Sequence, residues 1–295
     1  MTGELLVWCF LAAWTPRGVA DAGKVTVVYS SDAQPYVEAL DGLRSELGGA
    51  PVTVDLHAPN GRAQLGGSLD AGGNRVVIAI GRDALEAAAE HKNEAPLVAT
   101  MIMHSELSGR HSLAGGVRLD ISLSAILGEM RTVFPQKNRV AVLRNAAAPG
   151  QVDAAAVGRA RQQGFAVQII DLTKPEELLP IVRSLKGRVD LVVCLPDGTL
   201  YNSATVKPLI LAALESHLPI VGFSQNFVRA GAALGVYPDF RDIGAQTAEI
   251  AQKQLAGQPA GPVEGPRKLV VGVNQRVMRL LGLEYRESGN VVTVR

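Results

Sequence analysis

The sequence predicts an α/β protein with two doubly wound, parallel-sheet lobes joined by a hinge. Three observations lead to this fold class. Short runs rich in Val and Ile recur along the chain, and most of them are apolar throughout, as expected for parallel strands covered on both faces. Patterns typical of helices separate most of these runs. The first three strands of each half also start 27 and 23 residues apart, so the chain makes one βα arrangement twice.

The first half contains five predicted strands and one clear helix. The helix covers residues 35–47 and ends at Gly48 and Gly49, a typical stop signal. The strands are predicted at residues 25–29, 52–57, 75–80, 97–100 and 113–117.

The second half begins with an amphipathic helix, because apolar residues recur at spacings of three and four between Ile121 and Phe134. Residues 206–214 show the same pattern. A long helix is predicted at residues 242–255, before Gly257 and Pro259, and a short one at residues 275–281. The strands of this half are predicted at residues 139–143, 166–171, 189–195, 220–223 and 232–236.

Length and composition narrow the possible functions. A chain of 295 residues is long enough for two domains, and 47% apolar with 19% charged residues excludes global disorder. The formal net charge of +1 offers no electrostatic basis for binding nucleic acid. Two cysteines exclude a disulfide framework and a four-cysteine zinc site. The chain has no stretch of 18 apolar residues, so we expect no ordinary membrane-spanning helix.

Residues 1–22 have features of a secretory signal peptide. The apolar run from Leu5 to Trp14 has the length of a signal core, and Ala20 and Ala22 form an A-x-A cleavage pattern, although the usual basic residues before the run are missing. We expect cleavage after Ala22 and a periplasmic protein; the alternative is a buried N-terminal helix. The mature chain then keeps one cysteine, Cys194, within an apolar strand that protects a lone thiol.

Motifs for catalysis and for cofactors are weak. Residues 18–24 imitate a P-loop, but Val25 stands where a magnesium-binding Ser or Thr is needed. Residues 222–226 lack one glycine of a nucleophile elbow, and the His and Glu residues between 104 and 111 have no regular metal-ligand spacing. No glycine-rich dinucleotide motif follows a strand. The sequence therefore predicts no enzyme and no cofactor.

Polar turns follow the apolar strands. In doubly wound sheets, ligands bind beyond the carboxyl ends of strands, so these turns are candidates for ligand contact. The same residues can instead cap helices or form turns, and the sequence leaves both interpretations open. The turns are residues 30–32, 81–83, 144–145, 196–199 and 224–226.

Aromatic residues gather in one part of the chain. Five of the 13 lie between residues 201 and 240. Phe223 is expected in the core of its strand. Phe227 and Phe240 stand in polar connections flanked by glycine, where a ring can line a pocket.

Four segments of the second half resemble a known family. Residues 189–199, VDLVVCLPDGT, look like the family's buried strand followed by Pro and an Asp/Asn-Thr turn. LPIVGFS at 218–224 and VRAGA at 228–232 are similar to its next strand and V-x-x-G-A turn. YPDFRDIG at 237–244 is close to its G-x-D-Y-x-D-L-G segment, which opens a helix. The family is the substrate-binding proteins of ABC importers that includes tryptophan- and tyrosine-binding members. The resemblance covers residues 24–285 and is strongest over 186–285.

The resemblance implies a type I periplasmic binding-protein fold, in which two lobes close over a ligand. By this analogy, the first lobe contains residues 23–118 and 241–258, and the second contains residues 119–240 and 259–295. Arg82 departs from the small-Thr-Pro-like turn of better-known members; it could pair with a ligand carboxylate or phosphate, or bridge the lobes. The ligand contacts implied or proposed in this way are Ser30, Ser31, Arg82, Asn145, Asp197, Thr199, Ser224, Gln225 and Asn226.

The expected function is that of a non-catalytic periplasmic receptor for a small polar or amino-acid-like molecule. Its expected partners are that ligand and the permease and ATPase subunits of an ABC importer, and we expect a monomer. A periplasmic sensory protein without a transporter is the main alternative, and an enzyme that uses the cleft is a third. A repressor with the same fold would need an N-terminal DNA-binding helix pair, where this chain has its apolar run.

Overall fold

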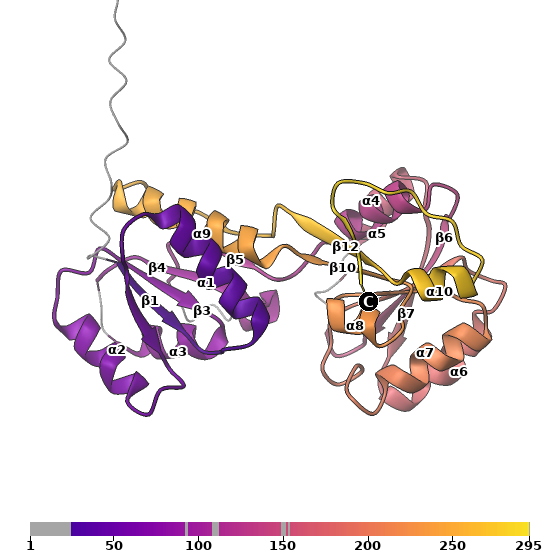
Figure 1. Ribbon diagram of the computed structural model, residues 1–295, viewed down its shortest axis with the longest axis horizontal. Coiled ribbons are helices and arrows are strands. Elements are labelled where there is room, and N and C mark those ends of the chain that lie inside the picture. Colours follow the sequence, from indigo (N-terminus) through magenta and orange to yellow (C-terminus); the bar gives the residue numbers. More distant parts are fainter. Residues whose placement is uncertain (1–24, 92–93, 108–111, 149–151, 153, 295) are drawn as a thin grey trace, which may run out of the picture.

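The computed structural model describes residues 25–91, 94–107, 112–148, 152 and 154–294 (Figure 1). It confirms the predicted α/β fold class, because two sheets of mainly parallel strands, each flanked by helices, form two lobes. The expected signal peptide lies outside the described residues. In the part that is described, no helix is long and apolar enough to cross a membrane.

The sheet of the first lobe has six strands in the order β11-β5-β4-β3-β1-β2, and all neighbours are parallel. All five side chains of β3 are buried, because helices cover both faces of this central strand. The five strands expected from the sequence all form, with ends that differ by a few residues. They are β1 (Val25–Tyr29), β2 (Val52–Asp55), β3 (Val76–Ile80), β4 (Leu97–Ile102) and β5 (Gly115–Arg118).

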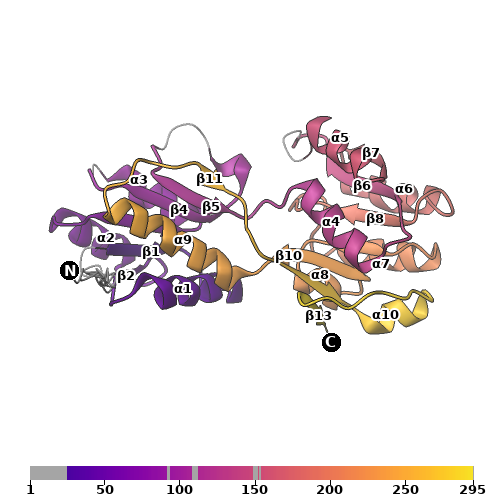
Figure 2. The same cartoon turned by 90° about the horizontal axis from the view of Figure 1, so that it is seen from above.

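Four helices cover the first sheet. Helices α1 (Gln34–Leu47) and α9 (Phe240–Leu255) share a core on one face, and α2 (Gly61–Asp70) and α3 (Arg82–Glu90) share a core on the other. Figure 2 shows α1 and α9 side by side, although they are distant in sequence. The two helices touch through backbone: a Cβ atom on Gly244 would lie 1.9 Å from the Ala39 carbonyl oxygen. Glycine is therefore required for this close approach.

The second sheet has seven strands in the order β13-β12-β10-β9-β8-β6-β7, and only β10 and β12 are antiparallel. Its strands are β6 (Arg139–Asn145), β7 (Ala166–Leu172), β8 (Leu191–Cys194), β9 (Ile220–Gly222), β10 (Leu234–Pro238), β12 (Leu269–Val273) and β13 (Val291–Thr293). Its helices are α4 (Leu123–Val133), α5 (Ala154–Gln162), α6 (Leu178–Ser184), α7 (Val206–Glu215), α8 (Gln225–Arg229) and α10 (Gln275–Leu280). Two apolar cores fill its two faces.

One segment lies elsewhere than the family analogy placed it. Strand β11 (Val263–Glu264) was expected with the second lobe, but it pairs with β5 on the first sheet. Gly261 also donates its N–H to the Ala114 carbonyl. This correction has a simple cause: two residues carry no apolar run that a sequence reading can detect, and the open edge of β5 offers the hydrogen bonds.

Three segments cross between the lobes: β5 to α4, β10 to α9, and β11 to β12. Asp242, in the first turn of α9, contacts the segment between β11 and β12 and so links the last two crossings. Its carboxylate, only 9% exposed, accepts hydrogen bonds from Nε and Nη2 of Arg267 at 3.0 and 3.3 Å, and Lys268 Nζ lies 3.4 Å away. Hydrogen bonds to Asp242 and Glu249 raise the pKa of Arg267. The last two crossings are therefore linked by these hydrogen bonds and ion pairs.

Candidate functional site

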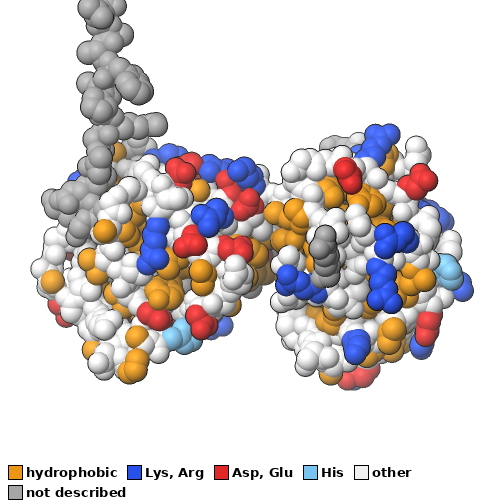
Figure 3. All heavy atoms as spheres, in the orientation of Figure 1, with side chains coloured by type: hydrophobic (Ala, Val, Ile, Leu, Met, Phe, Trp, Pro, Cys, Tyr) orange, Lys and Arg blue, Asp and Glu red, His pale blue; other side chains and the backbone are white. Residues whose placement is uncertain are grey.

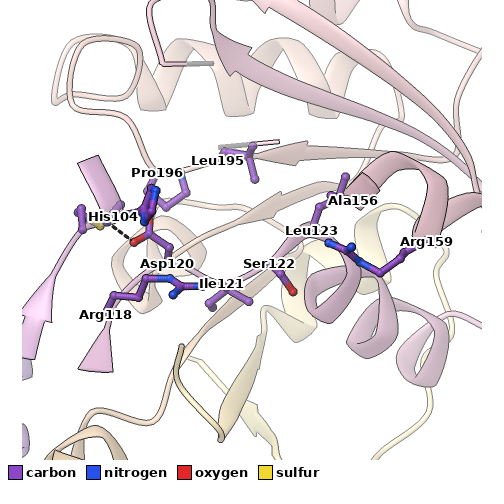
Figure 4. Close-up of a pocket in the computed structure, with 11 residues that line it drawn as sticks. His104, Arg118, Asp120, Ile121, Ser122, Leu123, Ala156, Arg159, Leu195 and Pro196 are labelled. Atoms are coloured by element: carbon purple, nitrogen blue, oxygen red, sulfur yellow. Dashed lines mark hydrogen bonds between the residues drawn. The ribbon is translucent and has the colours of Figure 1, made fainter. Parts of the chain in front are cut away.

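A pocket of about 240 Å³ lies where the two lobes meet (Figure 4). Met103 and His104 follow the carboxyl end of β4 in the first lobe, and Arg118 ends β5. Leu195 and Pro196 follow the carboxyl end of β8 in the second lobe. Carboxyl ends of strands from both sheets therefore line one space, as in other doubly wound ligand sites.

This interlobe pocket combines apolar walls with charged groups. The Asp120 carboxylate accepts a hydrogen bond from the backbone N–H of His104, and Nη1 of Arg118 donates to the Val263 carbonyl at 3.0 Å. Ser122 accepts from the Ala125 N–H and so caps α4, while Arg159 extends from α5. The pocket thus offers hydrogen-bond donors and acceptors beside Ile121, Leu123 and Leu195. None of the nine predicted site residues lines it.

The first lobe places Ser30 in a tight cluster at the carboxyl ends of β1 and β3. The Ser30 hydroxyl donates to the Ile80 carbonyl at 3.3 Å, and its own carbonyl lies 2.6 Å from His57 Nε2. Gly81 has φ +95°, and a Cβ atom there would come within 2.6 Å of Ser30 Oγ and of Tyr36 Cε1. His57 and Tyr36 were not singled out from the sequence, because only the fold brings them to Ser30.

Ser31 and Arg82 make local contacts. Ser31 Oγ accepts a hydrogen bond from the Ala33 N–H at 3.2 Å before α1 begins. Arg82 is exposed and donates from Nε to Glu86 Oε1 at 2.9 Å, one helical turn along α3. The hydrogen bond and the charge of Glu86 raise the pKa of Arg82. In this structure Arg82 therefore pairs within its own helix and does not bridge the lobes. Its contact with a ligand stays a prediction.

Asp197 accepts three hydrogen bonds within the second lobe. Its Oδ1 accepts the N–H groups of Thr199 at 2.9 Å and Leu200 at 2.8 Å, and its Oδ2 accepts Asn145 Nδ2 at 2.9 Å. Asn145 Oδ1 in turn accepts the Ala147 N–H. The structure thus brings Asn145, Asp197 and Thr199 together in one network. These are the hydrogen bonds expected of a turn-forming Asp197. Ligand contact by Asp197 stays a prediction.

Ser224 and Asn226 line a second pocket, of about 580 Å³, beyond β8 and β9 in the second lobe. Ser224 Oγ accepts the Phe227 N–H and so caps α8, whereas Gln225 is exposed and does not line the pocket. The rings of Tyr201, Phe223 and Phe227 form its apolar wall, and their centroids are 5.1 to 5.7 Å apart. We call these three residues the aromatic triad.

The other aromatic expected to line a pocket behaves differently. Phe240 packs against the core of the first lobe on the α1–α9 side. A pocket-lining role for Phe240 stays a prediction. The connection between β10 and α9 is short, so its ring meets the apolar face that α1 and α9 share.

Beneath the aromatic triad lies the buried Cys194. Burial raises the pKa of its thiol to about 12, so the thiol stays protonated and unreactive at neutral pH. Burial, with the nearby Cys194 and Asp197, also raises the pKa of Tyr201 well above its usual value. The Tyr201 hydroxyl has no well-formed hydrogen bond among the residues that the structure describes. Across those residues, no cluster of His, Cys, Asp and Glu could hold a metal ion.

Comparison with known proteins identifies the relatives of this chain. Residues 56–292 match the family model of the ABC transporter substrate binding protein. The match spans most of both lobes and therefore shows the family. No curated protein matches the chain at a significant level.

Three solved structures share the fold. One is the ligand-free, open structure of CD0873 from Clostridium difficile, a substrate binding protein with adhesive properties: 19% identity, TM-score 0.73, over 92% of this chain and 99% of that one. The second is an ABC domain from Streptococcus pneumonia in complex with L-Trp, at 18% identity and TM-score 0.59 over 92% and 99%. The third is a periplasmic ribose ABC transporter protein from Conexibacter woesei, at 12% identity and TM-score 0.53 over 89% and 96%.

Proposed function

This chain belongs to the ABC transporter substrate-binding proteins, and from that premise we propose that it is the periplasmic solute receptor of an importer. It binds a small polar or amino-acid-like molecule between its lobes and delivers it to the permease and ATPase subunits. It carries out no catalysis. The export signal expected in residues 1–22 takes it to the periplasm.

One observation carries this proposal: the interlobe pocket is lined by strand ends from both sheets. A molecule in that space touches both lobes, and a closer approach of the lobes adds contacts that this arrangement does not make. Because those added contacts form only in the closed state, the ligand favours that state. Figure 3 shows two rounded lobes that meet across a narrow waist, with a gap between them below it.

The predicted contact residues belong to both lobes. Ser30, Ser31 and Arg82 belong to the first lobe, and Asn145, Asp197, Thr199 and residues 224–226 to the second. Asp197 Oδ2 accepts one hydrogen bond from its own lobe and keeps capacity for a second, as an ammonium group would need. The solved L-Trp complex of the pneumococcal relative agrees with an amino-acid-like ligand.

Native mass spectrometry of freshly purified protein tests the proposal. We expect a solute that stays bound under native conditions and is released on denaturation. If none is present, a thermal-shift panel of amino acids and sugars should give at least one stabilising compound, because a ligand that binds only the folded state raises its stability. No bound solute and no stabilisation by any member of the panel would contradict the proposal.

A further inference from the structure

Two opposite charges flank the short crossing between β10 and α9. Glu38 lies on α1 in the first lobe, and Arg229 ends α8 in the second. Both views of the ribbon show α1 reaching the side of the first lobe that faces the second, and α8 on the side of the second lobe that faces the first (Figures 1 and 2). We infer that Glu38 and Arg229 form an ion pair between the lobes when the lobes approach each other, and so stabilise the closed state. The inference goes beyond the proposed function and rests on it for the closure itself.

Close packing places each charge at one end of this crossing. On the first-lobe side α1 lies against the start of α9, since a Cβ atom on Gly42, one turn after Glu38, would lie 1.9 Å from a backbone oxygen there. On the second-lobe side α8 lies against β10, since a Cβ atom on Gly235 would lie 2.6 Å from Cγ2 of Val228, the neighbour of Arg229. Both helices are therefore held beside the same crossing, one in each lobe.

One tyrosine responds to both charges. Tyr237 lies near the end of β10, just before the crossing. Burial raises the pKa of its hydroxyl; the positive charge of Arg229 opposes this rise, and the negative charge of Glu38 adds to it. Electrostatic effects fall with distance and are screened by water and salt, so both charges lie near this side chain. A carboxylate of the first lobe and a guanidinium of the second thus share one neighbour.

Both charged groups remain available for a partner. Within the part of the chain that the structure describes, neither Glu38 nor Arg229 forms an ion pair. Glu38 Oε1 accepts a hydrogen bond from Gln34 Nε2 at 2.8 Å, and Arg229 Nη1 donates to Asn226 Oδ1 at 3.4 Å. A carboxylate has a second oxygen and a guanidinium has five N–H groups, so each keeps capacity for a charged partner.

The net charges of the lobes act in the same direction. Residues 25–118 and 241–264 contain 14 Asp and Glu against 9 Lys and Arg, whereas residues 119–240 and 265–295 contain 12 against 18. A negative first lobe and a positive second lobe attract each other, and salt screens this attraction. An exposed ion pair changes an equilibrium constant by about fivefold at most. The pair therefore adjusts the balance between open and closed states, and the ligand remains the larger influence.

Cross-linking of the full chain, without any solute, tests this inference. Val37→Cys and Ala230→Cys place thiols beside the two charges, at exposed positions. A short bismaleimide joins these thiols when the lobes approach; each maleimide adds one thiol across its double bond, so no oxidant is needed. Cys9→Ser is present in every variant, and Cys194 is buried and protonated. The cross-linking rate is divided by the rate of labelling with N-ethylmaleimide, which corrects for the effect of a nearby charge on each thiol.

Charge variants of this double-cysteine protein decide the outcome. Glu38→Lys and Arg229→Glu should each slow cross-linking by about twofold to fivefold, because like charges then face each other. The two changes together should restore the rate of the parent, because opposite charges face each other again. Glu46→Lys makes the same change in net charge about 12 Å farther along α1, beyond the reach of a screened charge, and should leave the rate near that of the parent.

Salt gives a second measurement on the same proteins. Raising the salt concentration to about 0.5 M should slow cross-linking of the parent and of the doubly exchanged protein, and should bring all the variants toward one rate. The inference is overturned if the double exchange stays as slow as the single reversals, or if the rates are equal at low salt. Absence of any cross-link in the parent would also overturn it, because the two charges would then never meet.

The outcome separates this inference from the proposed function. If a solute co-purifies with the protein but the cross-linking rates ignore the charges, the receptor role stands and the interlobe ion pair is wrong. If the double exchange restores cross-linking but no solute is retained and no compound of the panel stabilises the protein, the ion pair stands and the receptor role is wrong.

Discussion

The two lobes repeat one βα arrangement, but the residues that follow the carboxyl ends of their strands pack differently. In the first lobe, Gly81, Ser30 and Tyr36 fit against one another so closely that a single added methyl group would overlap them. In the second lobe, the aromatic triad leaves an open pocket of about 580 Å³ beside it. A repeated fold therefore does not imply the same binding surface in both lobes. The first lobe has a close-packed polar surface at its strand ends, and the second has a cavity.

The lobes also differ in how glycine is used. In the first lobe, Gly42 and Gly244 let the backbones of α1 and α9 touch. Helix α9, which follows a crossing between the lobes, therefore packs closely against α1. In the second lobe, Gly222 makes room for a side chain, because a Cβ atom there would lie 2.6 Å from the ring of Phe227. Gly42 and Gly244 thus admit a neighbouring backbone, whereas Gly222 admits an aromatic ring.

The largest effect on stability is expected at the contact between α1 and α9 in the first lobe. Gly244→Leu places a side chain where the backbone of α1 lies, and should lower the free energy of unfolding by about 3 kcal/mol, at the upper end of what overpacking costs. Gly128→Ala is the matched control, because Gly128 is also helical but has nothing within 4 Å of its Cβ position. It should raise stability by about 0.5–1 kcal/mol. Urea unfolding measures the stability of both variants. Equal free energies of unfolding would contradict the close backbone contact between α1 and α9.

Asp197→Asn probes the polar network of the second lobe. An Asn that still accepts the Thr199 and Leu200 N–H groups turns its NH₂ toward Asn145 Nδ2, so two donors face each other. We expect a loss of about 1 kcal/mol in unfolding free energy, more than a simple cap exchange would cost. If Asp197 binds the ligand, affinity for the identified solute should also fall by about tenfold to a hundredfold. Calorimetric titration beside a melting curve separates the two effects; unchanged affinity would remove Asp197 from the site.

Tyr201→Phe tests the ring packing of the second lobe. The Tyr201 hydroxyl is buried without a well-formed hydrogen bond, so its removal should leave stability unchanged or raise it by up to about 1 kcal/mol. Tyr285→Phe is the control in the same lobe, since the Tyr285 hydroxyl lies 3.3 Å from Gln275 Nε2 and its loss should destabilise slightly. Thermal melting compares them. A clearly destabilised Tyr201→Phe would mean that the hydroxyl has a partner after all.

The smallest effect concerns pH and the amino ends of β6 and β8 in the second sheet. Partial burial alone would raise the pKa of Asp190, but hydrogen bonds from the Arg139 side chain and from the N–H groups of Arg139 and Asn138 outweigh it and lower that pKa. A lowered folded-state pKa contributes stability above the ordinary value of about 3.9, and this contribution is lost as pH falls through the folded value.

Melting curves of the parent and of Asp190→Asn across the acid range measure this contribution. The parent should be more stable by a constant amount above about pH 5, and the difference should shrink as the medium becomes more acidic than about pH 3.9. A difference that stays constant across the acid range would contradict this assignment.

Much of the fold could be predicted because its signals are local. The apolar runs and the helix spacings are properties of single segments, so strands β1 to β10 and helix α1 follow from them. Strand β11 has two residues and no apolar run, and its partner β5 is distant in sequence, so no local signal marks it.

The site was harder to predict because its contacts cross between elements. The bond between Asn145 and Asp197 exists because β6 and β8 are neighbours in the sheet. The interlobe pocket takes Arg118, Asp120 and Ser122 from a crossing segment whose sequence looks like an ordinary loop. The aromatic triad could be anticipated in part, since Phe227 was expected at a pocket. The meeting of its three rings, however, depends on the fold.

The central claim is that this protein closes over its ligand, and small-angle X-ray scattering tests it most directly. The solute identified by native mass spectrometry is added to ligand-free protein at saturating concentration, and the radius of gyration is compared. We expect a smaller radius of gyration, because the additional contacts of the ligand form only when the lobes approach each other. An unchanged scattering profile with a solute of proven tight affinity would contradict it.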